Sequence, residues 1–247
     1  MQQPSAGRPD DAEDPGGPVE SAIRCRLASS VLGAPLPNGA PAYTGARFER
    51  LTGGGDQPEV ANHFTPADFI AVAALSVDVP VRAVLRVLEP SGCSPYSCLL
   101  SQIPVDLELA AAEERHVAKD SPAWNLWQSL RDIEGIGPIG AGKLLARKRP
   151  RLLPVYDSVI KKVFERPSTD LTFWSDVRHS LRADHGILVA HLEDVRGLAG
   201  IGEDIGILRI LDTAAWFHGR NEHVETRPDG IPAEAPKSAA GSRSRLP

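Results

Sequence analysis

The segment from residue 130 to residue 145, LRDIEGIGPIGAGKLL, constrains the fold more than any other part of this chain. Gly135 and Gly137 bracket Ile136, and glycine accommodates the positive φ angles that a tight turn requires. Ala141 supplies a small side chain four residues after Gly137, where two helices would cross closely. The apolar residues that recur at helical spacing on either side of the turn are Leu130, Ile133, Leu144 and Leu145. The segment therefore predicts two helices joined by a tight turn, with Ile136 packed between them.

The rest of the chain also favours helices. Thr65-Pro66 and Ser121-Pro122 each place a good N-cap residue before a proline that suits the first helical turn. No alternating apolar run has the length of a useful strand, although a short extended piece is expected at 46–51. The four tryptophans lie on apolar faces and are expected in the core. The fold class is therefore predicted to be all-α, with helices at 65–75, 81–89, 105–118, 121–133, 138–147, 157–165, 170–184, 187–196 and 203–217.

Composition sets the boundaries of the folded part. Residues 1–43 are expected to be disordered or irregular, 44–220 to form the helical domain, and 221–247 to be a disordered tail. The chain has no apolar run long enough for a membrane span and no secretory signal. Its three cysteines, Cys25, Cys93 and Cys98, form no paired framework or metal-ligand set. We therefore expect a cytoplasmic protein without membrane association, metal or cofactor.

Charge gives a mixed indication about partners. The formal net charge of −5 argues against nucleic acid, but residues 131–166 hold nine basic and four acidic side chains, a local excess of +5. A run of this kind is either a solvated basic face or a phosphate-binding surface. Composition leaves both interpretations open.

The pattern at 130–145 resembles the helix-hairpin-helix family at eight positions. This resemblance implies that backbone amides near Gly135, Gly137 and Ile139 contact the phosphates of duplex DNA, with Ile136 supporting the turn. Lys143 and Arg147, one and two helical turns further along, would add side-chain contacts. The implied DNA-binding residues are Gly135, Ile136, Gly137, Ile139, Lys143 and Arg147. Such contacts position a protein on DNA without reading its sequence. The alternative is a turn that only packs two helices together.

The stretch after the turn resembles the base-excision DNA glycosylases of the helix-hairpin-helix superfamily. Asp157 lies twenty positions after Gly137 and is followed by Ser158 and a helical pattern of apolar and basic residues. The resemblance implies that Asp157 is the catalytic carboxylate, which would stabilise an oxocarbenium-like sugar or orient water after a base is flipped. Ile139 stands where bifunctional members carry a lysine nucleophile, so the implied activity is monofunctional, without lyase chemistry. The alternative role for Asp157 is to cap the following helix.

Four stretches, 44–49, 68–80, 103–106 and 143–157, resemble an uncharacterised protein family from high-GC actinobacteria. A second glycine-rich turn at 195–210 carries acids where a phosphate would bind, and we interpret it as structural. We therefore expect a DNA-binding protein related to, or degenerated from, the DNA glycosylases. The alternatives are an active monofunctional glycosylase that uses Asp157, and a helical protein–protein interaction module without a nucleic-acid role.

Overall fold

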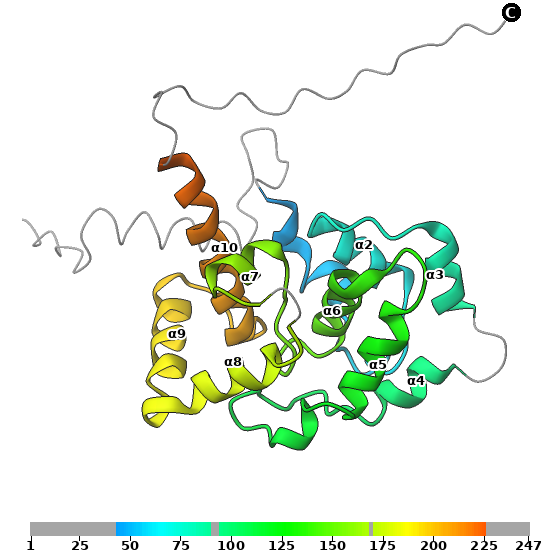
Figure 1. The fold of residues 1–247 in the computed structure, drawn as a ribbon, viewed down its shortest axis with the longest axis horizontal. Coiled ribbons are helices and arrows are strands. Elements are labelled where there is room, and N and C mark those ends of the chain that lie inside the picture. The colour runs from blue at the N-terminus through cyan, green and yellow to red at the C-terminus, as the bar shows by residue number, and fades with distance from the viewer. Residues whose placement is uncertain (1–42, 90–93, 168–169, 226–247) are drawn as a thin grey trace, which may run out of the picture.

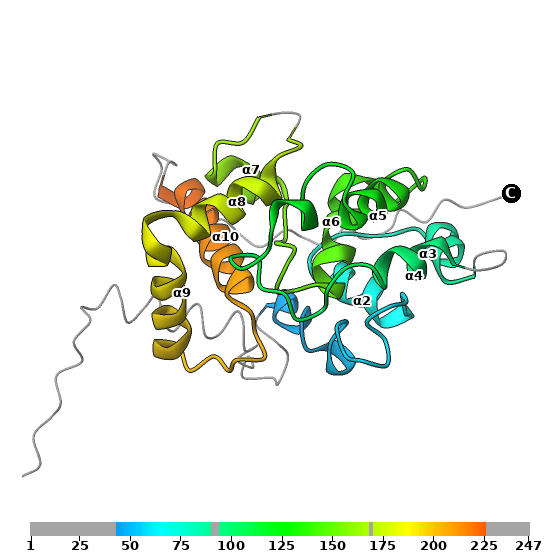
Figure 2. The ribbon, with the colours of Figure 1, turned by 90° about the horizontal axis from the view of Figure 1, so that it is seen from below.

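The computed structural model describes residues 43–89, 94–167 and 170–225, with side chains up to residue 220. Within these ranges every regular element is a helix and there is no strand, which confirms the predicted all-α class. The helices form two lobes that lie side by side, one built from α2–α6 and the other from α7–α10 (Figures 1 and 2). No helix in the described ranges has the length and apolar character needed to cross a membrane.

The first lobe surrounds α6. This helix packs against α2 and α5, and α5 also contacts α4. The elements of this lobe are η1 (Thr44–Arg47), η2 (Leu51–Gly53), α2 (Pro66–Ala74), α3 (Val81–Leu88), α4 (Pro95–Leu100), η3 (Glu114–His116), α5 (Pro122–Arg131) and α6 (Gly137–Lys148).

The second lobe is organised around α10, which contacts α7 and α9, while α8 packs on α9. Its elements are α7 (Ser158–Val163), α8 (Phe173–Arg182), η4 (Ala183–Gly186), α9 (Ile187–Leu198) and α10 (Ile207–Glu225). Because α10 continues to Glu225, the first five residues of the predicted C-terminal tail are helical. The rest of that tail, and residues 1–42 of the predicted irregular N-terminal segment, lie outside the described residues.

The capping residues act as the sequence predicts. At the start of α2, the backbone N–H of Thr65 donates to the Asp68 carboxylate at 2.8 Å. At the start of α5, the Ser121 hydroxyl accepts from the backbone N–H of Trp124 at 3.1 Å. Each contact gives a hydrogen-bond partner to a backbone N–H group that has none within its own helix.

Two predictions about local structure are wrong. Residues 105–118 form turns and η3 instead of an α-helix, and residues 46–51 contain parts of η1 and η2 instead of an extended piece. In the first case tertiary contacts outweigh helix propensity. The N–H of Leu109 donates to the carbonyl of Arg151, and Arg178 and Arg182 donate to the carbonyl of Ala112. These partners replace the hydrogen bonds that a helix would have made.

The basic segment at the end of α6 is buried. Arg147, Lys148 and Arg149 have at most 2% of their surface exposed. Arg147 donates to the carbonyls of Phe48, Glu49 and Leu51, and Lys148 donates to the carbonyl of Val60 at 3.0 Å. The cations thereby donate hydrogen bonds to backbone carbonyls of an irregular segment, which lacks the regular hydrogen bonds of a helix or sheet. This part of the basic run is neither a solvated face nor a phosphate-binding surface.

Candidate functional site

The predicted turn joins α5 to α6. Gly135 has φ +97° and Gly137 has φ +65°, both in the region that favours glycine. Ile136 is 5% exposed, so it is packed into the core as expected. The indole N–H of Trp127 in α5 donates to the carbonyl of Pro138 in α6 at 3.1 Å. This hydrogen bond, which the sequence did not indicate, ties the two helices together across the turn.

The tip of this turn is open to solvent. Gly135 and Ile139 are exposed, Gly137 is half-buried, and the first turn of α6 contains no acidic residue. The first N–H groups of a helix have no intrahelical partner and carry the positive end of its dipole. Pro138 contributes no donor, which leaves its neighbours to supply them. The surface is accessible to an anion, and the amide contacts implied by the resemblance stay a prediction.

Lys143 and Arg147 do not fit the DNA contacts expected of them. Their exposed fractions are 3% and 2%. The ammonium of Lys143 donates to the carbonyl of Leu75 at 3.0 Å, and Arg147 is held by the carbonyls described above. Because α6 is packed between α2 and α5, its side chains beyond the first turn face the interior. A duplex cannot reach these cations without unpacking α6.

Asp157 is the N-cap of α7. Its Oδ1 accepts from the backbone N–H groups of Val159 and Ile160 at 3.0 and 3.1 Å. Its Oδ2 lies 3.5 Å from the ammonium of Lys143, and the side chain is 17% exposed. Capping therefore occupies one carboxylate oxygen and leaves the other facing Lys143. The two roles that the sequence offered for Asp157 are geometrically compatible.

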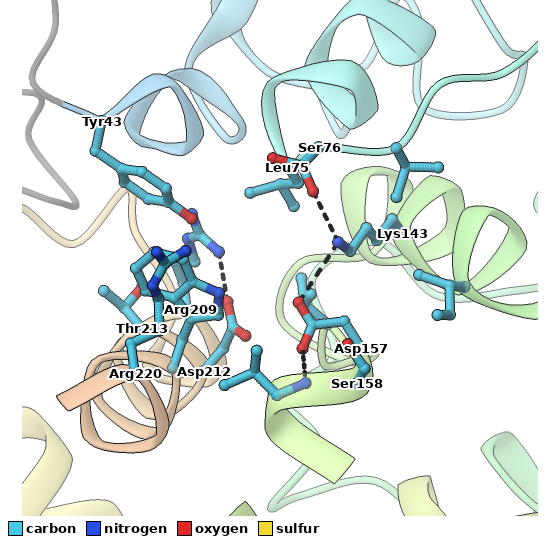
Figure 3. Close-up of a pocket in the computed structure, with 15 residues that line it drawn as sticks. Tyr43, Leu75, Ser76, Lys143, Asp157, Ser158, Arg209, Asp212, Thr213 and Arg220 are labelled. Carbon is cyan, nitrogen blue, oxygen red and sulfur yellow. Dashed lines mark hydrogen bonds and ion pairs between the residues drawn. The ribbon is translucent and has the colours of Figure 1, made fainter. Parts of the chain in front are cut away.

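A cavity of about 250 Å³, which we call the polar cavity, lies between the lobes beside Asp157 (Figure 3). Arg209 and Asp212 of α10 face Lys143 and Asp157 across it. Arg209 donates to Asp212, and its Nε lies 3.1 Å from the carboxylate of Glu49. Charges of opposite sign are thus already paired around this cavity.

Burial sets the protonation of these groups. Removal from water raises the pKa of Asp212 to about 6, and the nearby Asp157 charge acts in the same direction while Arg209 opposes it. Burial also lowers the pKa of Lys143, and the attraction of Asp157 limits that shift. The sequence analysis missed Asp212 because a lone Asp in α10 gives no signal until the fold brings it to Asp157.

A second cavity of about 500 Å³, the aromatic cavity, lies on the other side of Asp157. Its volume is within the range of about 300–1,000 Å³ that small-molecule sites occupy. It shares Ile139, Asp157 and Ser158 with the polar cavity. The aromatic side chains that line it are Trp124, Trp127, Tyr156, Phe173 and Trp174.

These rings come from both lobes. Tyr156 and Phe173 are stacked with centroids 4.2 Å apart, and Trp124 and Trp127 lie 5.1 Å apart. Trp124 is buried as expected, but Trp127 and Trp174 are only partly buried and line the cavity as well as packing on the core. The spacing of Trp124 and Trp127 could have indicated a shared face, whereas nothing in the sequence links them to Trp174.

Among the residues that the structure describes, no group of three or more His, Cys, Asp or Glu side chains is placed to hold a metal ion. Cys98 is a free, exposed thiol, and Cys25 and Cys93 lie outside the described residues. No curated protein and no solved structure matches this chain. One family model does match, over residues 28–219, which is most of the sequence. The chain therefore belongs to DUF6308, a family of unknown function.

Proposed function

We propose that this protein binds duplex DNA through the turn between α5 and α6. The observation that carries the proposal is the exposed start of α6, free of acids, which lies directly beside an aromatic cavity that reaches Asp157. The backbone donors and helix dipole suit a phosphate. Lys161 also lines the aromatic cavity and adds positive charge near the same surface, whereas the charge of Arg131 is paired with Asp132.

A charge placed at Gly137 tests this surface. Gly137 and Gly200 both have φ +65°, and a Cβ added to either would meet nothing within 4 Å. Asp tolerates this backbone region better than most residues. Gly137→Asp should therefore weaken duplex binding by about tenfold or more, roughly 1.4 kcal/mol, because the new carboxylate repels the phosphate. Binding would be measured by fluorescence anisotropy with a labelled duplex.

Gly200→Asp is the matched control, since it makes the same change at the same backbone angle in the other lobe and should bind like the wild type. Wild-type affinity should fall as salt rises, as phosphate contacts require, with a small slope because few phosphates are neutralised. Absence of binding at low salt, or equal loss in both variants, would contradict the proposed surface and favour the protein–protein interaction alternative.

The second candidate function is monofunctional excision of a base from DNA. It is favoured by the position of Asp157, which lines both cavities and whose second oxygen is not used in capping α7. A flipped base would stack among the rings of the aromatic cavity, and its glycosidic bond would then lie next to Asp157. In this role the Asp157 carboxylate, 3.5 Å from the ammonium of Lys143, stabilises positive charge developing on the sugar or orients the attacking water.

Asp157→Asn separates this chemistry from capping. An amide oxygen still accepts from Val159 and Ile160, so the fold should persist, but the negative charge is lost. Excision should fall by about 100-fold or more. The assay uses duplexes that each carry one modified base, with alkali to cleave at the abasic sites. Glu113→Gln, at an exposed carboxylate that lines neither cavity, should retain full activity.

Strand cleavage by the wild type without alkali would contradict the monofunctional assignment. Equal activity of Asp157→Asn and the wild type would exclude Asp157 as the catalytic carboxylate. A wild type that binds DNA but excises no base would leave the first proposal standing without the second.

A further inference from the structure

The polar cavity is lined by two carboxylates, Asp157 and Asp212, and by three cations, Lys143, Arg209 and Arg220, the last of which lies over the ring of Trp216. Lys143 pairs with Asp157, and Arg209 pairs with both Asp212 and Glu49. Hydrogen-bonding capacity nevertheless remains. Arg209 donates to Oδ2 of Asp212, and a carboxylate has room to accept further hydrogen bonds. The Thr213 hydroxyl, on a residue 3% exposed that also lines this cavity, has no partner among these residues.

This lining discriminates among chemical classes of ligand. A phosphate would meet the carboxylates of Asp157 and Asp212, and a cation would meet Lys143 and Arg209. Neutral hydroxyl groups avoid both costs, because each one can donate to a carboxylate and accept from an ammonium or a hydroxyl. The apolar side chains of Leu75, Val159 and Trp216 supply surface for a carbon skeleton.

The neighbouring cavity indicates what the hydroxylated group is attached to. The aromatic and polar cavities share Ile139, Asp157 and Ser158 in their linings, so they lie next to each other. Trp124, 7% exposed, lines the aromatic cavity, and its buried indole N–H has no acceptor among the residues that the structure describes. An unpaired buried donor favours a ligand that brings an acceptor, as the ring nitrogens and carbonyls of nucleobases do.

We propose that the polar cavity binds the pentose of a nucleoside unit whose base occupies the aromatic cavity. The inference rests on the proposed function in one respect, because both place the glycosidic bond at Asp157. It differs in the ligand, which is a free nucleoside that binds without any duplex: its sugar hydroxyls are available to the polar cavity, whereas the corresponding oxygens within a DNA strand are esterified to phosphate.

The experiment is isothermal titration calorimetry of the full chain with adenosine, guanosine, cytidine and uridine, each compared with its free base and with inorganic phosphate. At least one nucleoside should bind ten times more tightly than its free base. Thr213→Val, which keeps the side-chain shape, and Asp212→Asn should reduce that advantage severalfold while leaving free-base affinity unchanged. Trp124→Phe should weaken the nucleoside and its base equally. Glu113→Gln, at an exposed carboxylate that lines neither cavity, should change neither affinity.

The proposal is overturned if every nucleoside binds no better than its base, or if inorganic phosphate competes with the nucleoside for the site. It is also overturned if Thr213→Val and Asp212→Asn, shown by circular dichroism to be folded, both bind nucleosides like the wild type. Nucleoside binding without duplex binding would contradict the proposed DNA function and would still support this inference. Duplex binding without a preference for nucleosides would do the reverse.

Discussion

Asp68→Ala should destabilise the folded protein by about 3–5 kcal/mol, since it removes the shared counterion of two buried cations. Asp68 is 1% exposed, with Lys148 at 2.6 Å and the Nε of Arg147 at 3.4 Å. Loss of the carboxylate leaves positive charges that burial already disfavours, as the lowered pKa of Lys148 shows. It also removes the contact with Thr65 at the start of α2.

Urea denaturation followed by circular dichroism measures this change in the free energy of unfolding. Domains of this size have only about 5–15 kcal/mol of stability, so the variant should unfold at a much lower urea concentration. Asp132→Ala removes a carboxylate from an exposed pair with Arg131 and should cost less than about 1 kcal/mol. A similar small loss for Asp68→Ala would show that Arg147 and Lys148 are stabilised by the backbone carbonyls alone.

The second large effect is expected at Arg149, which is completely buried and whose guanidinium donates to backbone carbonyls and one side-chain amide in the described part of the chain. Its guanidinium donates to the carbonyls of Leu100, Ile103 and Ala61 at 2.6–2.8 Å, and to the side chain of Asn62 at 2.9 Å. Burial lowers its pKa to about 10, so the group stays charged at neutral pH. The guanidinium joins the segment before α2 to the end of α4. A side chain with fewer donors could not reach both segments at once.

Arg149→Met keeps much of the volume and removes every donor. Each carbonyl left buried without a partner costs about 1–3 kcal/mol, so the total loss should be at least about 3 kcal/mol. Thermal unfolding followed by calorimetry would detect it as a lower midpoint. Arg115→Met, at a side chain that is 72% exposed, is the control and should leave the midpoint nearly unchanged. A midpoint for Arg149→Met within 2 °C of the wild type would contradict this role.

Both predictions bear on how the basic run is interpreted. The positive charges at 143–149 suggested a surface for DNA, yet the structure uses them to satisfy carbonyls and one carboxylate inside the first lobe. The proposed duplex contact therefore depends on the backbone donors at Gly135–Ile139 and on cations at the cavity rim. This arrangement predicts modest affinity, since few phosphates are neutralised.

The sequence by itself determined the features that depend on neighbouring residues. Thr65-Pro66 and Ser121-Pro122 begin α2 and α5, the glycines around Ile136 make the turn, and Asp157 caps α7. These are local effects, because a cap or a positive φ is decided within a few residues along the chain. The turn and the capping role of Asp157 can therefore be predicted without knowledge of tertiary contacts.

Only the tertiary structure decided which side chains meet. Residues 105–118 have the composition of a helix, but the hydrogen bonds of Leu109 and Ala112 to distant residues hold them in turns instead. Lys143 lies next to Asp157 and faces Asp212 because the two lobes pack together. For the same reason Trp127 and Trp174 line one cavity. Periodicity reports which face of a helix is apolar and not what lies opposite it. The buried cations and both cavities therefore depend on the packing of segments far apart in the chain.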